Sequence, residues 1–136
     1  MSRTLLICKP DAVARGLVGQ IIDRVERKGL RLAAASLRMI TEAEASEHYA
    51  EHAGRPFYEG LVSFITGSPS FLCVVEGPEE TWKIVRTLMG PTNPADAPPG
   101  TIRGDFGTDV GENLVHGSDA EASALREIKL FFPDLV

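Results

Sequence analysis

The order of strand-like and helical segments predicts an α/β (α+β) fold with a ferredoxin-like βαββαβ core. Continuous apolar runs alternate with apolar residues at helical spacing. The segments follow one another roughly as strand, helix, strand, two helices, strand, helix, long loop, strand and helix. We therefore expect a four-stranded antiparallel sheet with helices packed on it. The length of 136 residues suits one domain with one good core, so we expect a single domain over residues 1–136.

The first strand and helix are the clearest elements. Leu5–Cys8 is an apolar run typical of a strand that is covered on both faces, and Pro10 follows it closely. A helical stripe comes next, made of Val18, Ile21, Ile22 and Val25. Gly29 is expected to cap that helix, and a second strand is predicted between Leu30 and Ile40.

The middle of the chain predicts two helices and a strand. Thr41–Glu44 matches a capping box, and the helix that it begins is expected to reach about Gly54. A second stripe predicts a short helix that Gly67 ends; it is made of Phe57, Leu61, Phe64 and Ile65. Phe71–Val75 is apolar throughout and predicts the third strand.

The last part contains a helix, a loop, a strand and a final helix. Pro78 is expected near the first turn of the fourth helix. The buried side of that helix is predicted to include Trp82, Val85 and Met89. Residues 90–107 hold many Pro and Gly residues and predict a functional loop. The final helix is expected to turn one apolar side inward, namely Leu125, Ile128 and Phe132.

The segment Asn113–Asp119 holds the most informative histidine. Leu114 and Val115 are expected to end a strand, and Gly117 to make the turn after His116. Ser118-Asp119-Ala120-Glu121 matches a capping box, which places His116 at a strand-to-helix junction near anion-binding N–H groups. A neutral imidazole is nucleophilic near pH 7. Taken alone, however, a single histidine is more often structural.

Composition limits the class of protein. Hydrophobic residues make up 43% of the chain and charged residues 24%, which is ordinary for a soluble globular protein. No apolar run approaches the roughly 20 residues of a membrane span. The net charge of -5 argues against a broad nucleic-acid surface, but a few cations can still bind a small anion. Without an export signal, a cytoplasmic location is expected. Cys8 and Cys73 are predicted to be buried, reduced thiols.

Several other residues could join His116 in a phosphate site. Singly, each has an ordinary interpretation as a surface charge, a turn hydroxyl or a core aromatic. Together they supply the cations, the hydroxyl and the aromatic face that a nucleoside polyphosphate site needs; they are Lys9, Phe57, Arg86, Thr92 and Arg103. Neither a Walker motif nor a GxGxxG loop is present.

His48 and His52 lie four residues apart on an expected helix. That spacing can bind zinc, but the glutamate of an HExxH motif is missing. An ordinary surface helix is the favoured interpretation.

These motifs resemble those of a known family. Asn113–Asp119 is similar to the active-site signature of the nucleoside diphosphate kinases, and Pro99–Phe106 is similar to a second long signature. Three shorter motifs also match family positions: Lys9-Pro10-Asp11, His48-Tyr49 and Pro56-Phe57. The resemblance covers nearly the whole chain.

The resemblance implies a phosphotransferase. Such an enzyme moves the terminal phosphoryl group of a nucleoside triphosphate, such as ATP or GTP, onto a nucleoside diphosphate. It does so by a ping-pong route through a phosphohistidine. Mg²⁺ is expected on the nucleotide phosphates, with no metal ligand from protein side chains. The family forms homo-oligomers, and a hexamer is expected rather than a tetramer.

The resemblance also assigns roles. His116 matches the nucleophile, reacting through Nδ1. Lys9, Arg86, Thr92 and Arg103 match phosphate contacts, Phe57 the base-stacking aromatic, and Asn113 with Lys9 the sugar contacts. Supporting residues are Tyr49, Ser118 and Glu127, the last orienting the imidazole.

Two departures from the family pattern stand out. Glu112 occupies a position where many members have Arg, so a cationic contribution is lost there. Gly67-Ser68-Pro69 reverses the more familiar Ser-Gly-Pro order, and a local turn adjustment is expected. Two other functions stay open from the residues: a nucleotide-binding regulatory module, and a protein histidine phosphocarrier with weak turnover.

Overall fold

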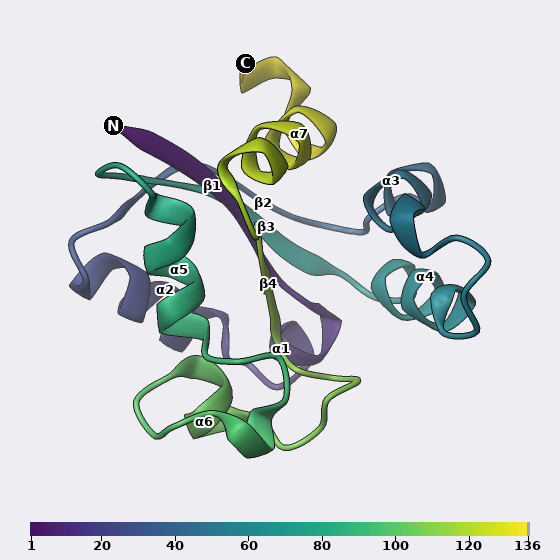
Figure 1. The fold of residues 1–136 in the computed structure, drawn as a ribbon, viewed down its shortest axis with the longest axis horizontal. Coiled ribbons are helices and arrows are strands. Elements are labelled where there is room, and N and C mark those ends of the chain that lie inside the picture. Colours follow the sequence, from purple (N-terminus) through teal and green to yellow (C-terminus); the bar gives the residue numbers. More distant parts are fainter. Residues whose placement is uncertain (136) are drawn as a thin grey trace.

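A computed structural model describes residues 1–135, and its centre is one four-stranded sheet (Figure 1). The strands are β1 (Ser2–Cys8), β2 (Arg31–Arg38), β3 (Ser70–Gly77) and β4 (Val115–Gly117), in the spatial order β2-β3-β1-β4. Every neighbouring pair is antiparallel. The ferredoxin-like α+β prediction is therefore confirmed, and β1 lies between the strand of His116 and the rest of the sheet.

Seven α-helices surround the sheet in the described part of the chain. They are α1 (Pro10–Ala14), α2 (Val18–Arg27), α3 (Glu42–His48), α4 (Tyr58–Thr66), α5 (Thr81–Met89), α6 (Ile102–Phe106) and α7 (Glu121–Phe131). Three short 3-10 turns complete the chain: η1 (Ala50–His52), η2 (Pro94–Asp96) and η3 (Pro133–Leu135). None of the helices over residues 1–135 has the length and apolar character that crossing a membrane requires.

Both faces of β1 are buried, which explains its continuous apolar sequence. Leu6 and Cys8 pack with α2, α5 and α6, whereas Leu5 and Ile7 pack with α3, α4 and α7. Figure 1 shows α2 and α5 together on one side of the strands and α3 and α4 on the other. Cys8 and Cys73 are buried free thiols, as predicted. Burial raises the pKa of the Cys8 thiol to about 12.

The helix predicted from Thr41 to about Gly54 is shorter than expected. Its capping box is present, because the Thr41 side chain accepts from Glu44 N and the Glu44 side chain accepts from Thr41 N. However, α3 ends at His48 and the chain continues into the 3-10 turn η1. His48 is buried, with ring centroids 4.6 Å from His116 and 5.4 Å from Phe131. Tertiary packing overrides helix propensity at this position.

Two other helix predictions need correction. The helix predicted to begin near Pro78 is α5, which begins at Thr81. Glu80 has a left-handed φ of 59°, which interrupts a helix at that point. The predicted inward side of α7 included Leu125, but this prediction is wrong because Leu125 is 59% exposed. The inward side is rotated so that the carboxylate of Glu127 points at the sheet beside Ile128.

The segment 90–107 is more ordered than the predicted loop. It contains η2 and α6, and the Thr101 side chain caps α6 by accepting from Gly104 N at 2.9 Å. Gly104 packs so closely on the Pro98 carbonyl that no larger residue fits. Arg24 of α2 bonds Asp105 at 2.7 Å. These contacts fix the part of the loop that carries Arg103.

Candidate active site

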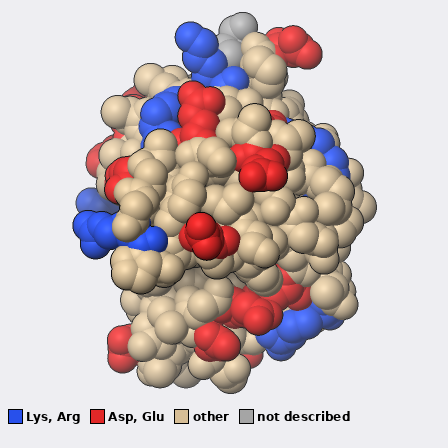
Figure 2. Space-filling view, turned by 90° about the vertical axis from the view of Figure 1, so that its right-hand side faces the viewer, with Lys and Arg blue, Asp and Glu red and all other residues tan. Residues whose placement is uncertain are grey.

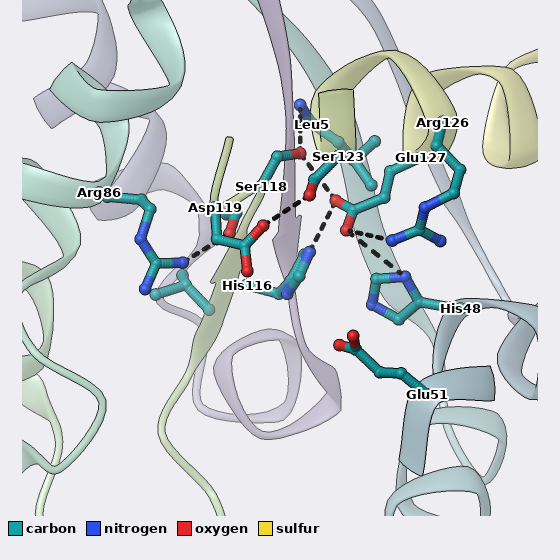
Figure 3. Close-up of polar contacts among 12 residues, drawn as sticks. Leu5, His48, Glu51, Arg86, His116, Ser118, Asp119, Ser123, Arg126 and Glu127 are labelled. Atoms are coloured by element: carbon teal, nitrogen blue, oxygen red, sulfur yellow. Dashed lines mark hydrogen bonds and ion pairs between the residues drawn. The ribbon is translucent and has the colours of Figure 1, made fainter. Parts of the chain in front are cut away.

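His116 lies in the middle of β4, paired with Ile7 of β1. Its Nε2 is 2.9 Å from Oε1 of Glu127, and 24% of its side chain is exposed (Figure 3). Because Nε2 is engaged by the carboxylate, Nδ1 is the ring nitrogen that remains for a ligand. A carboxylate partner of this kind fixes both the tautomer and the orientation of an imidazole.

Glu127 is held in place from two sides. Besides the imidazole, it accepts a 2.7 Å hydrogen bond from the Ser118 hydroxyl, which in turn accepts from Leu5 N at 3.3 Å. Burial opposes ionisation of Glu127, but the hydrogen bond and charge of His116 and the hydrogen bond of Ser118 outweigh it. The pKa of Glu127 is lowered to about 2. The carboxylate is therefore ionised at neutral pH and stabilises positive charge on the ring.

The expected capping box at Ser118 is wrong. The residue before α7 is Ala120, which has extended backbone and makes no side-chain cap, while the Ser118 hydroxyl is used by Glu127. His116 also lies within the strand and not at a turn. Gly117 is required for packing and not for a turn, since a Cβ there would meet Met89 Sδ at 2.5 Å.

The unusual backbone in this region belongs to Leu114, whose φ is 76°. Such a conformation is strained for a branched residue and persists only where surrounding contacts hold it. Asp11 Oδ2 accepts from Leu114 N at 3.0 Å, and Lys9 N donates to Leu114 O at 2.8 Å. The Lys9-Pro10-Asp11 motif thus holds the backbone of Leu114, the residue that directly precedes β4.

A hollow of about 220 Å³ lies over His116. Its lining includes His48, Tyr49, His52 and the guanidinium-bearing Arg86. Arg86 donates to the carbonyl of Gly117 at 2.9 Å. Because Gly117 follows His116 directly in the chain, this bond holds the guanidinium charge close to the His116 side of the hollow. Burial, then the charge of Glu127, raises the pKa of Tyr49 to about 12, so its phenol stays protonated. The hollow can therefore receive an anionic group directly above the nucleophilic ring.

Arg103 is buried and tied to the backbone by three hydrogen bonds. Its Nε, Nη1 and Nη2 donate to the carbonyls of Asn113, Gly90 and Val115 at 3.1, 3.0 and 2.7 Å. A guanidinium has five N–H donors, so two remain for an anion. Arg103 does not line the hollow itself, but it is fixed next to the strand that carries His116.

The positive charges of Lys9 and Arg103 repel one another, and both side chains have little contact with solvent. Burial, followed by the charge of Arg103, lowers the pKa of Lys9 to about 8, although Asp11 partly opposes this. Burial, followed by the charge of Arg86, lowers the pKa of Arg103 to about 10. Cations that converge in this way gain stability when an anion binds between them.

Asn113 connects Lys9 to the loop. Its Oδ1 accepts from Lys9 Nζ at 2.9 Å and its Nδ2 donates to the carbonyl of Thr92 at 3.0 Å. Thr92 itself is exposed. Phe57 is 48% exposed at the start of α4, with its ring 5.2 Å from that of His52. The structure thus brings Lys9, Asn113 and Thr92 together and leaves Phe57 free to receive a flat ring.

Sequence reasoning missed two features of this site. From helix spacing alone His48 was interpreted as a surface residue, although the family resemblance included His48-Tyr49. It is buried against His116, and its Nδ1 has no hydrogen-bond partner within residues 1–135. His52 was also assigned to the surface, yet it lines the hollow. Their four-residue spacing suggested one helix, but α3 ends at His48 and His52 lies in η1, and both line the hollow over His116. Glu112 is exposed.

Comparisons with known proteins find relatives that match nearly the whole chain. A family model described as nucleoside diphosphate kinase matches residues 2–135. A nucleoside diphosphate kinase of Archaeoglobus fulgidus is 56% identical over 98% of this chain and 88% of its own, and one of Thermobifida fusca is 54% identical over 99% of each. A halophilic nucleoside diphosphate kinase of Halobacterium salinarum, solved in complex with CDP, superposes with a TM-score of 0.93 at 52% identity, covering 96% of this chain and 87% of its own.

Proposed function

The chain belongs to the nucleoside diphosphate kinase family, and we propose that its phosphoryl group travels on Nδ1 of His116. The enzyme transfers the terminal phosphoryl group of a nucleoside triphosphate to a nucleoside diphosphate. One observation carries the proposal for His116. Its Nε2 is bound by Glu127 at 2.9 Å, and the ring forms part of the wall of the 220 Å³ hollow.

The proposed reaction has two mirror-image steps. In the first, the Nδ1 lone pair attacks the terminal phosphorus of the triphosphate, and the bond from that phosphorus to the bridging oxygen breaks. The diphosphate leaves with the electron pair, and the phosphoryl group stays on His116. A terminal oxygen of a second diphosphate then attacks the phosphorus of the phosphohistidine, the bond from phosphorus to Nδ1 breaks, and its electron pair returns to Nδ1. Because donor and acceptor occupy the same place in turn, one nucleotide pocket is enough.

Positive charge near His116 supports the transfer. Arg86 and Arg103 are fixed to backbone carbonyls beside the imidazole, and the charge of the half-buried Lys9 lies near that of Arg103. Such preorganised donors stabilise the charge that accumulates on a transferring phosphoryl group. We expect Mg²⁺ to arrive on the nucleotide and to neutralise part of the phosphate charge.

The base is proposed to stack on Phe57, whose exposed ring offers an aromatic face without a hydrogen-bonding edge. Stacking is worth about 1–3 kcal/mol and is largely independent of base identity. The relative from Halobacterium salinarum was solved with CDP. We therefore expect ATP, GTP, CTP and UTP to phosphorylate His116 with efficiencies within about two orders of magnitude.

Assembly and location are proposals as well. Leu37 near the end of the outer strand β2 and Met39 just after it are 63% and 47% exposed, and such apolar edges are suited to contacts between copies. We propose a homo-oligomer and expect a hexamer rather than a tetramer.

Figure 2 shows the side of α3 and α4, where red carboxylate side chains are scattered over the centre of the face. That surface does not suit nucleic acid. A cytoplasmic location stays a prediction.

A two-stage labelling experiment tests the function. The protein is mixed with triphosphate carrying a radiolabelled terminal phosphate, and unlabelled diphosphate is then added. We expect acid-labile, base-stable label on the protein that discharges onto nucleotide, and no label on His116→Ala. Label that transfers only to another protein would indicate a phosphocarrier. Nucleotide binding without label would indicate a regulatory module.

A further inference from the structure

Three metal-ligating side chains meet at the rear of the hollow. His48, His116 and Glu127 each offer one donor atom, and these atoms all lie within 4.8 Å of one another. Figure 3 shows the two imidazole rings directed at the Glu127 carboxylate from α3 and β4. We propose that this cluster binds a divalent transition-metal cation of the zinc class, which inhibits phosphoryl transfer by occupying the catalytic imidazole.

The individual distances suit capture by small side-chain movements. His48 Nδ1 lies 4.0 Å from Glu127 Oε2, and His116 Nε2 lies 2.9 Å from Glu127 Oε1. A tetrahedral zinc ion with ligands at about 2.0–2.1 Å holds its donor atoms about 3.4 Å apart. The 4.0 Å separation must therefore shrink, the 2.9 Å separation must widen slightly, and all three donor atoms start within 4.8 Å of one another. The fourth position would face the hollow.

His48 makes the cluster more than a hydrogen-bonded pair. Its side chain is only 4% exposed, and Nδ1 has no hydrogen-bond partner within the described residues. A buried nitrogen without a partner is costly unless it gains a ligand. The donor nitrogen of His48 also lies within reach of the Glu127 carboxylate, at 4.0 Å from Oε2.

The charges around the hollow also admit a cation. Three carboxylates line it, those of Glu51, Asp119 and Glu127, against the two guanidiniums of Arg86 and Arg126. Arg126 lies 3.7 Å from Glu127, but its side chain is 52% exposed and can swing into solvent. Lys9 and Arg103, the other cations of the proposed phosphate site, do not line the hollow. The carboxylates at its wall can therefore attract a cation beside the proposed phosphate position.

The metal would act on the nucleophile through the ring. Binding at Nε2 displaces the proton that His116 shares with Glu127, and that proton is released to solvent. The cation then withdraws electron density from Nδ1 and competes for the carboxylate that orients the imidazole. This inhibition rests on the proposed role of His116, whereas binding of the metal does not.

Cobalt(II) is the direct probe, because its visible absorption distinguishes tetrahedral from octahedral coordination. Titrating the nucleotide-free enzyme should give a tetrahedral spectrum that zinc abolishes by competition. His48→Gln and Glu127→Gln should each weaken cobalt binding at least about tenfold, since even outer partners of metal-binding histidines contribute 10–100-fold. His52→Gln removes a histidine of the same hollow and should leave the affinity unchanged. Circular dichroism identifies any variant that fails to fold, and the other then decides.

The outcomes separate the two proposals. An octahedral spectrum, or an affinity that neither Gln variant changes, overturns the metal site. Tetrahedral binding that leaves the rate of His116 phosphorylation unchanged overturns the inhibition. A tetrahedral spectrum in an enzyme that forms no phosphohistidine keeps the metal site and rejects the proposed nucleophile.

Discussion

Two regions beside His116 hold their charges in opposite ways. On the carboxylate side, made of His116, Ser118 and Glu127, every partner is in place before any substrate arrives. The pKa of Glu127 falls to about 2, which means that the fold favours its charged form despite burial. The imidazole of His116, the proposed nucleophile, is therefore oriented by the protein alone.

The cation side, made of Lys9, Arg86 and Arg103, has charges of one sign only. The pKa values of Lys9 and Arg103 fall to about 8 and 10, so their charged forms are destabilised by burial and by their neighbours. This region keeps an electrostatic cost that an incoming phosphate relieves. The His116 imidazole is thus fully oriented in the free enzyme. Under the proposed function, the positive charges of the cation side gain their negative partners only when the substrate binds.

Removing one guanidinium from the cation side should have the largest effect. Arg86→Ala and Arg103→Ala should each lower the rate of both half-reactions by about 10²–10³, the loss seen for one preorganised donor. Arg103→Ala should also destabilise the fold, because the carbonyls of Gly90, Asn113 and Val115 lose their donor. Stopped-flow phosphorylation and denaturant unfolding measure the two effects. Equal stability of the two variants would show that the three carbonyl contacts contribute little.

Neutralising the carboxylate side should have a smaller effect. Glu127→Gln keeps an acceptor for His116 Nε2 but removes the charge that stabilises the ring. We expect phosphorylation to slow by about one to two orders of magnitude, the range found for second partners of functional histidines. Ser118→Ala, which removes only a hydrogen bond to Glu127, is the matched control and should slow it less. A Gln variant with the wild-type rate would show that Glu127 is structural.

His48 gives the carboxylate side a pH dependence of stability. Its pKa in the folded protein is about 3, below the ordinary value of 6.5, so the unfolded state binds more protons between these values. Stability is fully present above pH 6.5 and is lost as the pH falls, by up to about 1.4 kcal/mol per unit. Unfolding by urea at about pH 6.5 and 5, before the carboxylates titrate, should show this slope. His48→Gln should flatten it, and an unchanged slope would contradict the burial of a neutral ring.

Glu112 gives the smallest expected effect. It is exposed, and it replaces the Arg that many family members have. Glu112→Arg should tighten nucleotide binding by a few-fold and steepen its salt dependence, because exposed charges contribute about 0–1 kcal/mol. Isothermal titration at two salt concentrations measures both. Affinity that does not change with either the substitution or salt would place this side chain away from the nucleotide.

The sequence predicted the parts of the molecule that local pattern controls. The apolar run Leu5–Cys8, the stripe of α2 and the capping box at Thr41 all appear as expected. The spatial order of the four strands is not local: the pattern alone supported the ferredoxin-like arrangement only weakly, and the family resemblance added the rest. Periodicity and capping are local properties, so they can be read without the fold.

The errors arise where tertiary contacts compete with local pattern. Ser118 fits a capping box, but the buried carboxylate of Glu127 takes its hydroxyl. Leu125 fits an apolar stripe, but α7 is rotated to aim Glu127 at His116. Helix spacing does not distinguish His48 from a surface histidine, and only the family resemblance singled out His48-Tyr49. In each case the site residue breaks the local rule, as functional positions often do.

The central claim is that Glu127 holds Nε2 so that phosphorus bonds to Nδ1 of His116. The most direct measurement is nuclear magnetic resonance of the phosphoenzyme prepared with ¹⁵N-labelled histidine. The account predicts ¹⁵N–³¹P coupling at Nδ1 of His116 and a protonated Nε2. Coupling at Nε2, or phosphorus on Ser118 in place of the histidine, would contradict it.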